Sequence, residues 1–122
     1  SSDMRDIRAA AQSGNERAQL AIEMFAARIK KFIGSYAALM GGLDMIVFTG
    51  GIGENDATTR RLVSENLEFM GVHFNSELNE SVHGENTLLS LPDSRVKVAV
   101  VATNEELVIA SDTFRLTTPS VK

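Results

Sequence analysis

The sequence has no cysteine among its 122 residues, which excludes disulfide bonds and thiolate chemistry. It also has no apolar run near the roughly 20 residues that a helix needs to cross a bilayer. A basic stretch followed by an apolar one, the pattern of a signal peptide, is absent as well. We therefore do not expect a membrane-spanning or secreted protein, and the predicted location is the cytoplasm.

Positive charge is scarce in this sequence. Twelve Lys and Arg stand against sixteen Asp and Glu, so the formal net charge is −4 and the pI is about 5.1. Proteins that bind nucleic acid or anionic membranes use a basic surface, so neither is a predicted partner. The 43% hydrophobic and 23% charged residues are typical of a globular protein, and we expect residues 1–122 to form a single domain.

Two helices are predicted at the start of the chain. The opening letters SSDMRDIR predict a helix over residues 3–12, and because the first residue is not methionine we interpret the chain as a segment of a longer protein. Ser13 and Glu16 have the spacing of a capping box and predict a long helix that ends at Gly41 and Gly42. Apolar residues recur along it every three or four positions, namely Ala18, Ile22, Phe25, Ile29, Phe32, Tyr36 and Leu39. This stripe indicates a core helix, with an additional subunit interface as the alternative.

Apolar runs in the rest of the chain predict an α/β fold. Residues 44–50, DMIVFTG, form an unalternating run that indicates a strand covered on both faces, as in a parallel sheet between helices. We expect a helix over residues 57–70, strands over 71–74, 87–91 and 96–103, a polar and turn-rich stretch over 75–87, and a closing helix over 104–116. Strands and helices in this order are typical of the α/β class.

Three glycines, Gly50, Gly51 and Gly53, stand between the first strand and the next helix. Glycine suits a positive φ or a close approach of backbone to ligand, and amide groups at a helix start suit phosphate or another anion. The letters match neither a Walker loop, since no lysine follows, nor a Rossmann fingerprint, since the third glycine is missing. A nucleotide or phosphate site and a tight turn, with Asn55 or Asp56 capping the next helix, both stay open.

A second strand end, within VAVVATNEELVIA, carries two adjacent acids. Thr103 and Glu106 have the spacing of a capping box. Glu105 stands where carboxylates commonly hold Mg²⁺ through oxygen, and a surface acid favoured by the helix dipole is the alternative. Near the start of the chain, Asp3 and Arg5 are interpreted from their spacing alone as an exposed pair.

The remaining chemistry-bearing residues predict no catalytic set. His73 and His83 lack the neighbouring acid, histidine or cysteine spacing of a metal site, and no GxSxG nucleophile motif is present. The residues alone therefore supply no complete active site.

Four stretches, SSDMRD, MFAARIKKFIGSYAALMGGLDMIVFTGGIGEN, MGV and ATNEELVIASDT, together resemble the C-terminal segment of the acetate and propionate kinase family. The resemblance runs in order along essentially the whole chain. It implies a ribonuclease-H-like α/β domain of the actin, Hsp70 and sugar kinase superfamily, with a mixed sheet flanked by helices. It also implies the reaction ATP + acetate = ADP + acetyl phosphate, with Mg²⁺, and a homodimer that binds ATP or ADP.

The resemblance assigns two stretches to nucleotide contact, which are Asp3, Met4 and Arg5 at the start and Gly51, Ile52, Gly53, Glu54 and Asn55 in the glycine segment. It assigns Glu105 to Mg²⁺ and leaves Glu106 as a cap. Ala102 stands where proline is common in the family, which changes a turn rather than a ligand.

The family's acid-binding pocket and catalytic arginines precede the part that this chain resembles. The resemblance therefore implies no catalytic residue here, most of the acetate pocket outside the chain, and no kinase activity for the chain alone. Two alternatives stay open, a propionate kinase segment and a non-catalytic interaction or dimerisation domain.

Overall fold

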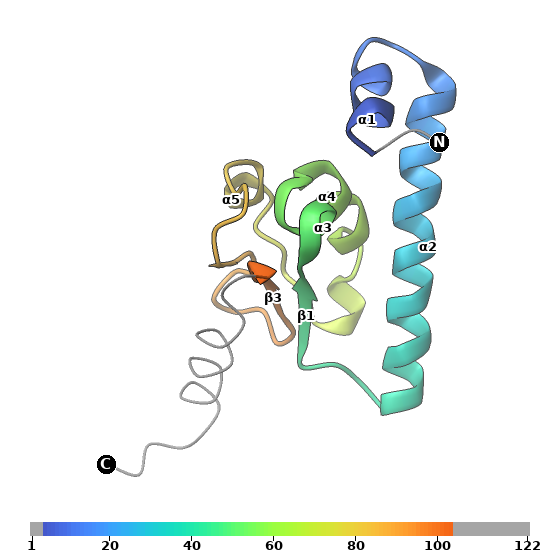
Figure 1. The fold of residues 1–122 in the computed structure, drawn as a ribbon. Helices are drawn as coiled ribbons and strands as arrows, with labels where there is room; N and C mark the ends of the chain where they lie inside the picture. The colour runs from blue at the N-terminus through green and yellow to red at the C-terminus, as the bar shows by residue number, and fades with distance from the viewer. Residues whose placement is uncertain (1–3, 104–122) are drawn as a thin grey trace.

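The computed structural model describes residues 4–103, whose arrangement Figure 1 shows. The elements are α1 (Met4–Gln12), α2 (Glu16–Met40), β1 (Met45–Phe48), α3 (Gly50–Asn55), α4 (Ala57–Ser64), the 3-10 turn η1 (Glu68–Met70), α5 (Ser76–Glu80), β2 (Thr87–Leu88) and β3 (Lys97–Val100). In Figure 1, α1 lies beside the N-terminal half of α2, and the strands and short helices form a body beside that helix. The predicted closing helix lies outside the described residues.

A mixed sheet organises this body, as the family resemblance implies. β1 and β3 are parallel, with Met45 opposite Lys97 and Phe48 opposite Val100, and β2 pairs antiparallel with β3, giving the order β1-β3-β2. The core is apolar and centres on these strands and on the helices beside them; it contains Ala26, Ile46, Phe48, Val63, Leu67, Val72, Val82, Leu89, Val96, Val98 and Val100. None of the helices within residues 4–103 has the length and apolar character to cross a membrane.

Two strand predictions are corrected. Residues 71–74 form no strand and contribute one isolated bridge, between Phe74 and Ser90. The backbone N–H of His73 instead donates to the hydroxyl of Ser94 at 2.8 Å. A side-chain oxygen therefore takes the place of the carbonyl that a neighbouring strand would offer to this N–H. In β1, Ile46 and Phe48 are buried but Met45 and Val47 are 37% and 48% exposed, so residues 4–103 cover one face of the strand, where the sequence predicts cover on both.

The residue that caps the long helix α2 is not the one that the sequence predicts. Asn15, rather than Ser13, is the cap, because its side chain accepts the backbone N–H of Ala18 at 3.0 Å. Ser13 turns back and donates to the carbonyl of Ala9 at 2.8 Å, closing α1. The helix ends as predicted at Gly41, whose φ of +78° is left-handed.

The helix predicted over residues 57–70 is divided in the structure. α4 ends at Ser64 and a separate 3-10 turn follows, because Asn66 adopts a positive φ of 63° that a continuous α-helix does not allow. The turn-rich stretch over residues 75–87 contains the short helix α5, whose cap is Asn75 accepting the N–H of Leu78 at 3.0 Å. Asp56 caps α4, as one of the two sequence alternatives proposes.

Candidate functional site

The glycine segment at the end of β1 is a short helix rather than a loop, which corrects the sequence prediction. Gly50 takes a φ of +76°, so the chain can turn sharply from β1 into α3. A Cβ on Gly53 would lie 3.1 Å from the carbonyl carbon of Phe48, so this glycine lets α3 pack against the strand. A Cβ on Gly51 would meet nothing within 4 Å. The space beside Gly51 is open for a ligand.

A pocket of about 400 Å³ lies beside Gly51, between α1 and α3. Its lining consists of Met4, Arg5, Arg8, Gly51, Ile52, Asn55 and Asp56. Five residues that the family resemblance assigns to nucleotide contact therefore border one cavity, although more than 40 positions separate the two groups in the sequence. Gly53 and Glu54 do not line the pocket, and Asp3 lies outside the described residues.

Glu54 points towards the other strand end instead. Its carboxylate oxygen accepts both the backbone N–H and the hydroxyl of Thr103, each at 3.2 Å. Thr49, just before α3, donates its hydroxyl to the carbonyl of Val101 at 2.7 Å. These contacts fasten α3 to the segment that leaves β3, the same segment that carries Glu105 two residues later, outside the described part.

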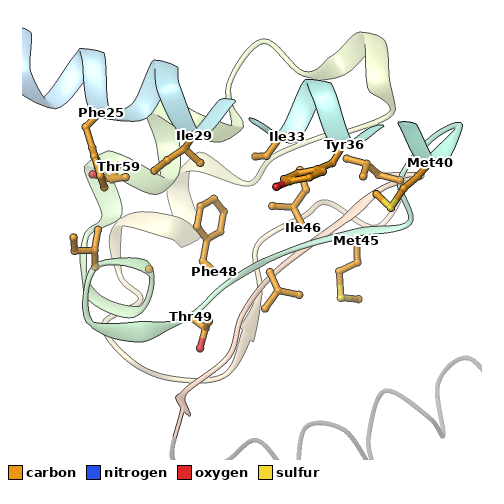
Figure 2. A pocket seen from close by; sticks show the side chains of 14 residues that line it. Phe25, Ile29, Ile33, Tyr36, Met40, Met45, Ile46, Phe48, Thr49 and Thr59 are labelled. Atoms are coloured by element: carbon orange, nitrogen blue, oxygen red, sulfur yellow. The ribbon is translucent and has the colours of Figure 1, made fainter. Parts of the chain in front are cut away.

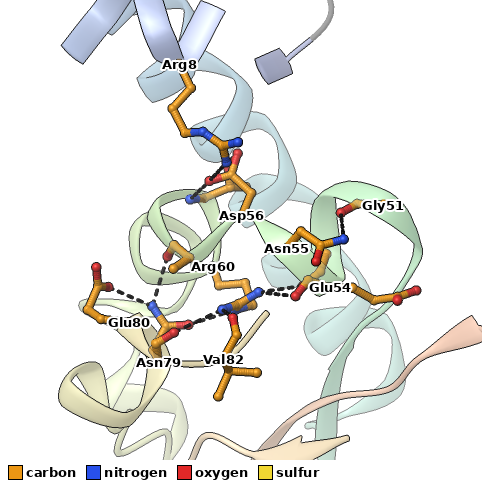
Figure 3. Close-up of polar contacts among 12 residues, drawn as sticks. Arg8, Gly51, Glu54, Asn55, Asp56, Arg60, Asn79, Glu80 and Val82 are labelled. Atoms are coloured by element: carbon orange, nitrogen blue, oxygen red, sulfur yellow. Dashed lines mark hydrogen bonds and ion pairs between the residues drawn. The ribbon is translucent and has the colours of Figure 1, made fainter. Parts of the chain in front are cut away.

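Arg8 and Asp56 connect α1 with the start of α4, as Figure 3 shows. Arg8 Nη1 lies 3.2 Å from Asp56 Oδ1, and the Asp56 carboxylate also accepts the backbone N–H and the hydroxyl of Thr59 at 3.1 and 3.0 Å. Asp56 is buried. Asp56 is one of the two caps that the sequence offers, whereas Arg8 is not among the predicted site residues; its position one turn after Arg5 is the signal that could have found it.

Arg60 is the second residue that sequence reasoning misses. It is fully buried and donates to the carbonyls of Gly53 and Glu54 in α3 and to groups near α5 (Figure 3). The available signal is its spacing, since in the helix predicted over residues 57–70 Arg60 would share one face with Val63 and Leu67, three and seven residues later.

Within residues 4–103 no three His, Asp or Glu side chains are arranged to hold a metal ion. Glu105, the residue assigned to Mg²⁺, lies outside that range.

His73 Nδ1 lies 3.1 Å from the Asp93 carboxylate, and the hydrogen bond from His73 lowers the pKa of Asp93. Hydrogen bonds from its own backbone N–H and from that of His83 lower the pKa of Glu85.

A second, apolar groove of about 540 Å³ lies between α2 and β1. Figure 2 shows Phe25, Ile29 and Ile33 of α2 facing Ile46 and Phe48 of the strand. Its lining has no charged side chain, so its chemistry is packing rather than recognition of an anion. Of the two cavities, the polar one beside α3 is the candidate ligand site.

Solved structures of known proteins have the same fold. A crystal structure of the acetate kinase from Porphyromonas gingivalis matches 97% of this chain with a TM-score of 0.83 and 52% identity. The acetate kinase from Entamoeba histolytica matches with 0.80 and 33%, and a propionate kinase from Francisella tularensis with 0.72 and 40%. Fold and site together therefore define a ribonuclease-H-like α/β domain of the actin, Hsp70 and sugar kinase superfamily, which confirms the predicted fold class.

Sequence comparison identifies the family within this superfamily. The model of the Acetokinase family matches residues 1–111. Curated acetate kinases from Porphyromonas gingivalis and Geobacillus kaustophilus are 54% and 57% identical, each over 116 residues. The chain belongs to the acetokinase family, as the resemblance implies.

The match covers only part of each relative. It includes 95% of this chain but 29% of the length of the curated acetate kinases, and 30% of the P. gingivalis crystal structure. The chain therefore spans less than a third of the length of these enzymes.

The Arg8–Asp56 contact leads to a stability prediction. Asp56→Ala should lower the free energy of unfolding by at least about 1 to 2 kcal/mol, because α4 loses its cap and Arg8 loses its partner. Glu65→Ala, which breaks the exposed Arg61–Glu65 pair at 3.3 Å, is the control and should cost about 0.5 kcal/mol or less. Chemical denaturation measures both, and equal losses would contradict the structural role of Asp56.

Proposed function

We propose that the chain is the C-terminal, nucleotide-binding part of an acetate kinase that catalyses ATP + acetate = ADP + acetyl phosphate. The observation that supports this most directly is the polar pocket, which Met4 and Arg5 share with Gly51, Ile52 and Asn55. The names of the closely similar relatives support the choice of reaction.

The pocket lining suits a nucleotide in three ways. Met4 and Ile52 supply apolar surface for a base, and the absence of a side chain at Gly51 allows close approach to a ribose or phosphate. Arg5 and Arg8 add guanidinium groups, which bind phosphate well. We assign nucleotide contact to Asp3, Met4, Arg5 and residues 51–55, with Glu54 also fixing Thr103.

Glu105 is proposed as the ligand of Mg²⁺. A carboxylate near the phosphates can hold this ion directly or through water, and the ion neutralises the charge that phosphoryl transfer develops. The contacts of Glu54 with Thr103 hold the start of the Glu105 segment close to α3, which supports this assignment.

The acid that accepts the phosphoryl group is a separate question. A propionate kinase also shares this fold, with 40% identity, and propionate is the alternative substrate. The pocket that selects the acid is proposed to lie mostly outside this chain, so acetate rests on the relatives alone.

Gly51→Val in the full-length enzyme tests the nucleotide site. The added side chain meets no protein atom within 4 Å of its Cβ, so the fold should persist while the side chain occupies the pocket. We expect KM for ATP to rise about tenfold or more, equivalent to about 1.4 kcal/mol of binding.

Gly34→Val is the matched control, because a Cβ there also meets nothing within 4 Å and Gly34 lies in α2, away from the pocket. It should leave KM for ATP unchanged. An unchanged KM in Gly51→Val, with normal thermal stability, would overturn the proposed nucleotide site.

The isolated 122-residue chain should have no kinase activity. Phosphoryl transfer requires groups on both sides of the phosphate to position it and to stabilise its charge, and this chain is proposed to supply one side. A coupled assay of ATP formation from acetyl phosphate and ADP measures this, with the full-length enzyme as positive control. Robust turnover by the isolated chain would contradict the prediction.

An exposed apolar face of α2 supports a second role, as part of a homodimer interface. Phe32, Tyr36 and Leu39 are 50%, 56% and 82% exposed, and the first two rings stack at a centroid distance of 6.4 Å. The predicted stripe is therefore divided, since Ile22 is buried and Ile29 packs against the core, whereas its C-terminal part lies on the surface. Contiguous apolar surface of this kind is typical of a protein contact, and the same face supports the alternative of a pure interaction domain.

Leu39→Glu in the full-length enzyme tests the homodimer. A carboxylate on this side chain, the most exposed of the three, should leave folding intact and convert dimer to monomer, as measured by light scattering. Ala27→Glu, an exposed position on another side of α2, should remain dimeric. A wild-type enzyme that is monomeric, or a Leu39→Glu variant that stays dimeric, would rule this interface out.

A further inference from the structure

Arg60 has an unusual environment for a charged side chain. It lies in α4 and none of its surface is exposed. Burial lowers the pKa of its guanidinium from the ordinary value, and the carboxylates of Asp56, Glu80 and Glu85 act in the opposite direction. No carboxylate lies within ion-pair distance of Arg60 among the described residues, so backbone and amide oxygens hold this cation.

Five hydrogen bonds leave the Arg60 guanidinium, which matches its five N–H donors. Nη1 donates to the carbonyls of Gly53 and Glu54 at 3.0 and 2.8 Å. Nε and Nη2 donate to the side-chain and backbone oxygens of Asn79 at 2.7 and 3.0 Å, and Nη2 also donates to Val82 at 2.7 Å. One side chain thus joins α4, the end of α3 and the α5 region.

The α5 end of this connection is itself fixed. Asn79 is fully buried, and its amide donates to the carbonyl of Ala57 at 2.9 Å and to the Glu80 carboxylate at 3.1 Å. Figure 3 shows Asn79 and Arg60 side by side, with Val82 beyond them. Arg60 therefore reaches α3 from a rigid support.

The helix α3 needs outside support. It has six residues, three of them glycine, and a helix this short and glycine-rich is unstable alone. Its terminal carbonyls lack partners within the helix, and a cation at a helix C-terminus is favourable. Arg60 supplies both a cation and two donors at that end, while Gly51 and Asn55 of α3 border the pocket.

We propose that Arg60 is a positioning residue for the nucleotide site, which holds Gly51 and Asn55 in place by binding the last carbonyls of α3 without touching the ligand. A buried arginine costs more desolvation than an apolar side chain of similar size, so packing alone does not account for it. The inference rests on the proposed function, because it identifies what keeps that pocket in shape.

Arg60→Lys in the full-length enzyme is the first test. Lysine keeps the charge but has three donors on one atom and cannot form the fork. We expect KM for ATP to rise about tenfold and KM for the acid to change less than twofold. Arg61→Lys, at the neighbouring residue whose guanidinium forms an ion pair with Glu65, is the control and should change neither constant.

Asn79→Ala separates positioning from stability. It removes one acceptor of Arg60 but leaves both bonds to α3, so it should lower the melting temperature and change KM for ATP less than twofold. If Arg60→Lys and Asn79→Ala raise this KM in proportion to their loss of stability, Arg60 is merely structural and the inference is wrong. If Arg60→Lys yields no folded enzyme, Asn79→Ala decides, because a raised KM for ATP there would overturn the inference and an unchanged one supports it.

The two proposals fail in different ways. A wild-type enzyme that neither binds nor turns over ATP would overturn the proposed function. A wild-type enzyme that turns over ATP, together with an Arg60→Lys variant whose KM for ATP is normal, would overturn the role of Arg60 alone.

Discussion

Parallel pairing of β1 with β3 is the constraint on which the rest of the structure depends. In parallel strands the C-terminal ends lie at one edge of the sheet, so the segments that leave them meet although about 50 residues separate them. The contacts at this edge extend the pairing beyond the strands, since Val101 N–H donates to Phe48 at 2.9 Å and Thr49 donates to Val101 at 2.7 Å. Each such bond contributes on the order of 1 kcal/mol, so several together are needed to hold the glycine segment beside the exit of β3.

The long helix α2 provides the other half of the geometry. Its buried side packs over Ile46 and Phe48 of β1, and its N-terminal half supports α1, which the Arg8–Asp56 pair joins to α4. The pocket beside Gly51 therefore depends on two separate sets of contacts. The sheet positions α3, and the packing of α1 on α2 positions Arg5. A shift of α2 along the strand would separate Arg5 from Gly51 without breaking either local structure.

Local pattern predicts the elements of this chain better than their details. The helix over residues 16–40, the parallel strands and the cap at Asp56 follow from periodicity, apolar runs and side-chain chemistry that act over a few residues. Asn15 displaces Ser13 as a cap because two suitable residues lie within one turn, and Ser13 instead donates to the carbonyl of Ala9 in α1. Arg60 is not predicted because its hydrogen-bond acceptors are far apart in the sequence. Its five acceptors come from α3, from Asn79 and from Val82, which is 22 residues away, and no local pattern encodes such a set.

These contacts suggest why the glycine segment is built from residues that cannot support a helix themselves. Gly50 and Gly53 are required by the turn and by the approach to Phe48, and the bare backbone of Gly51 leaves room for a ligand. These glycines also lower the helix propensity of α3 and give it few side-chain contacts. Its order therefore has to come from contacts with other segments, through Arg60, which binds its carbonyls, and through Glu54, which binds Thr103. Gly51 thus leaves space for a ligand, whereas Arg60 and Glu54 keep the backbone of α3 rigid. The residues that border the pocket therefore need not be the ones that determine its shape.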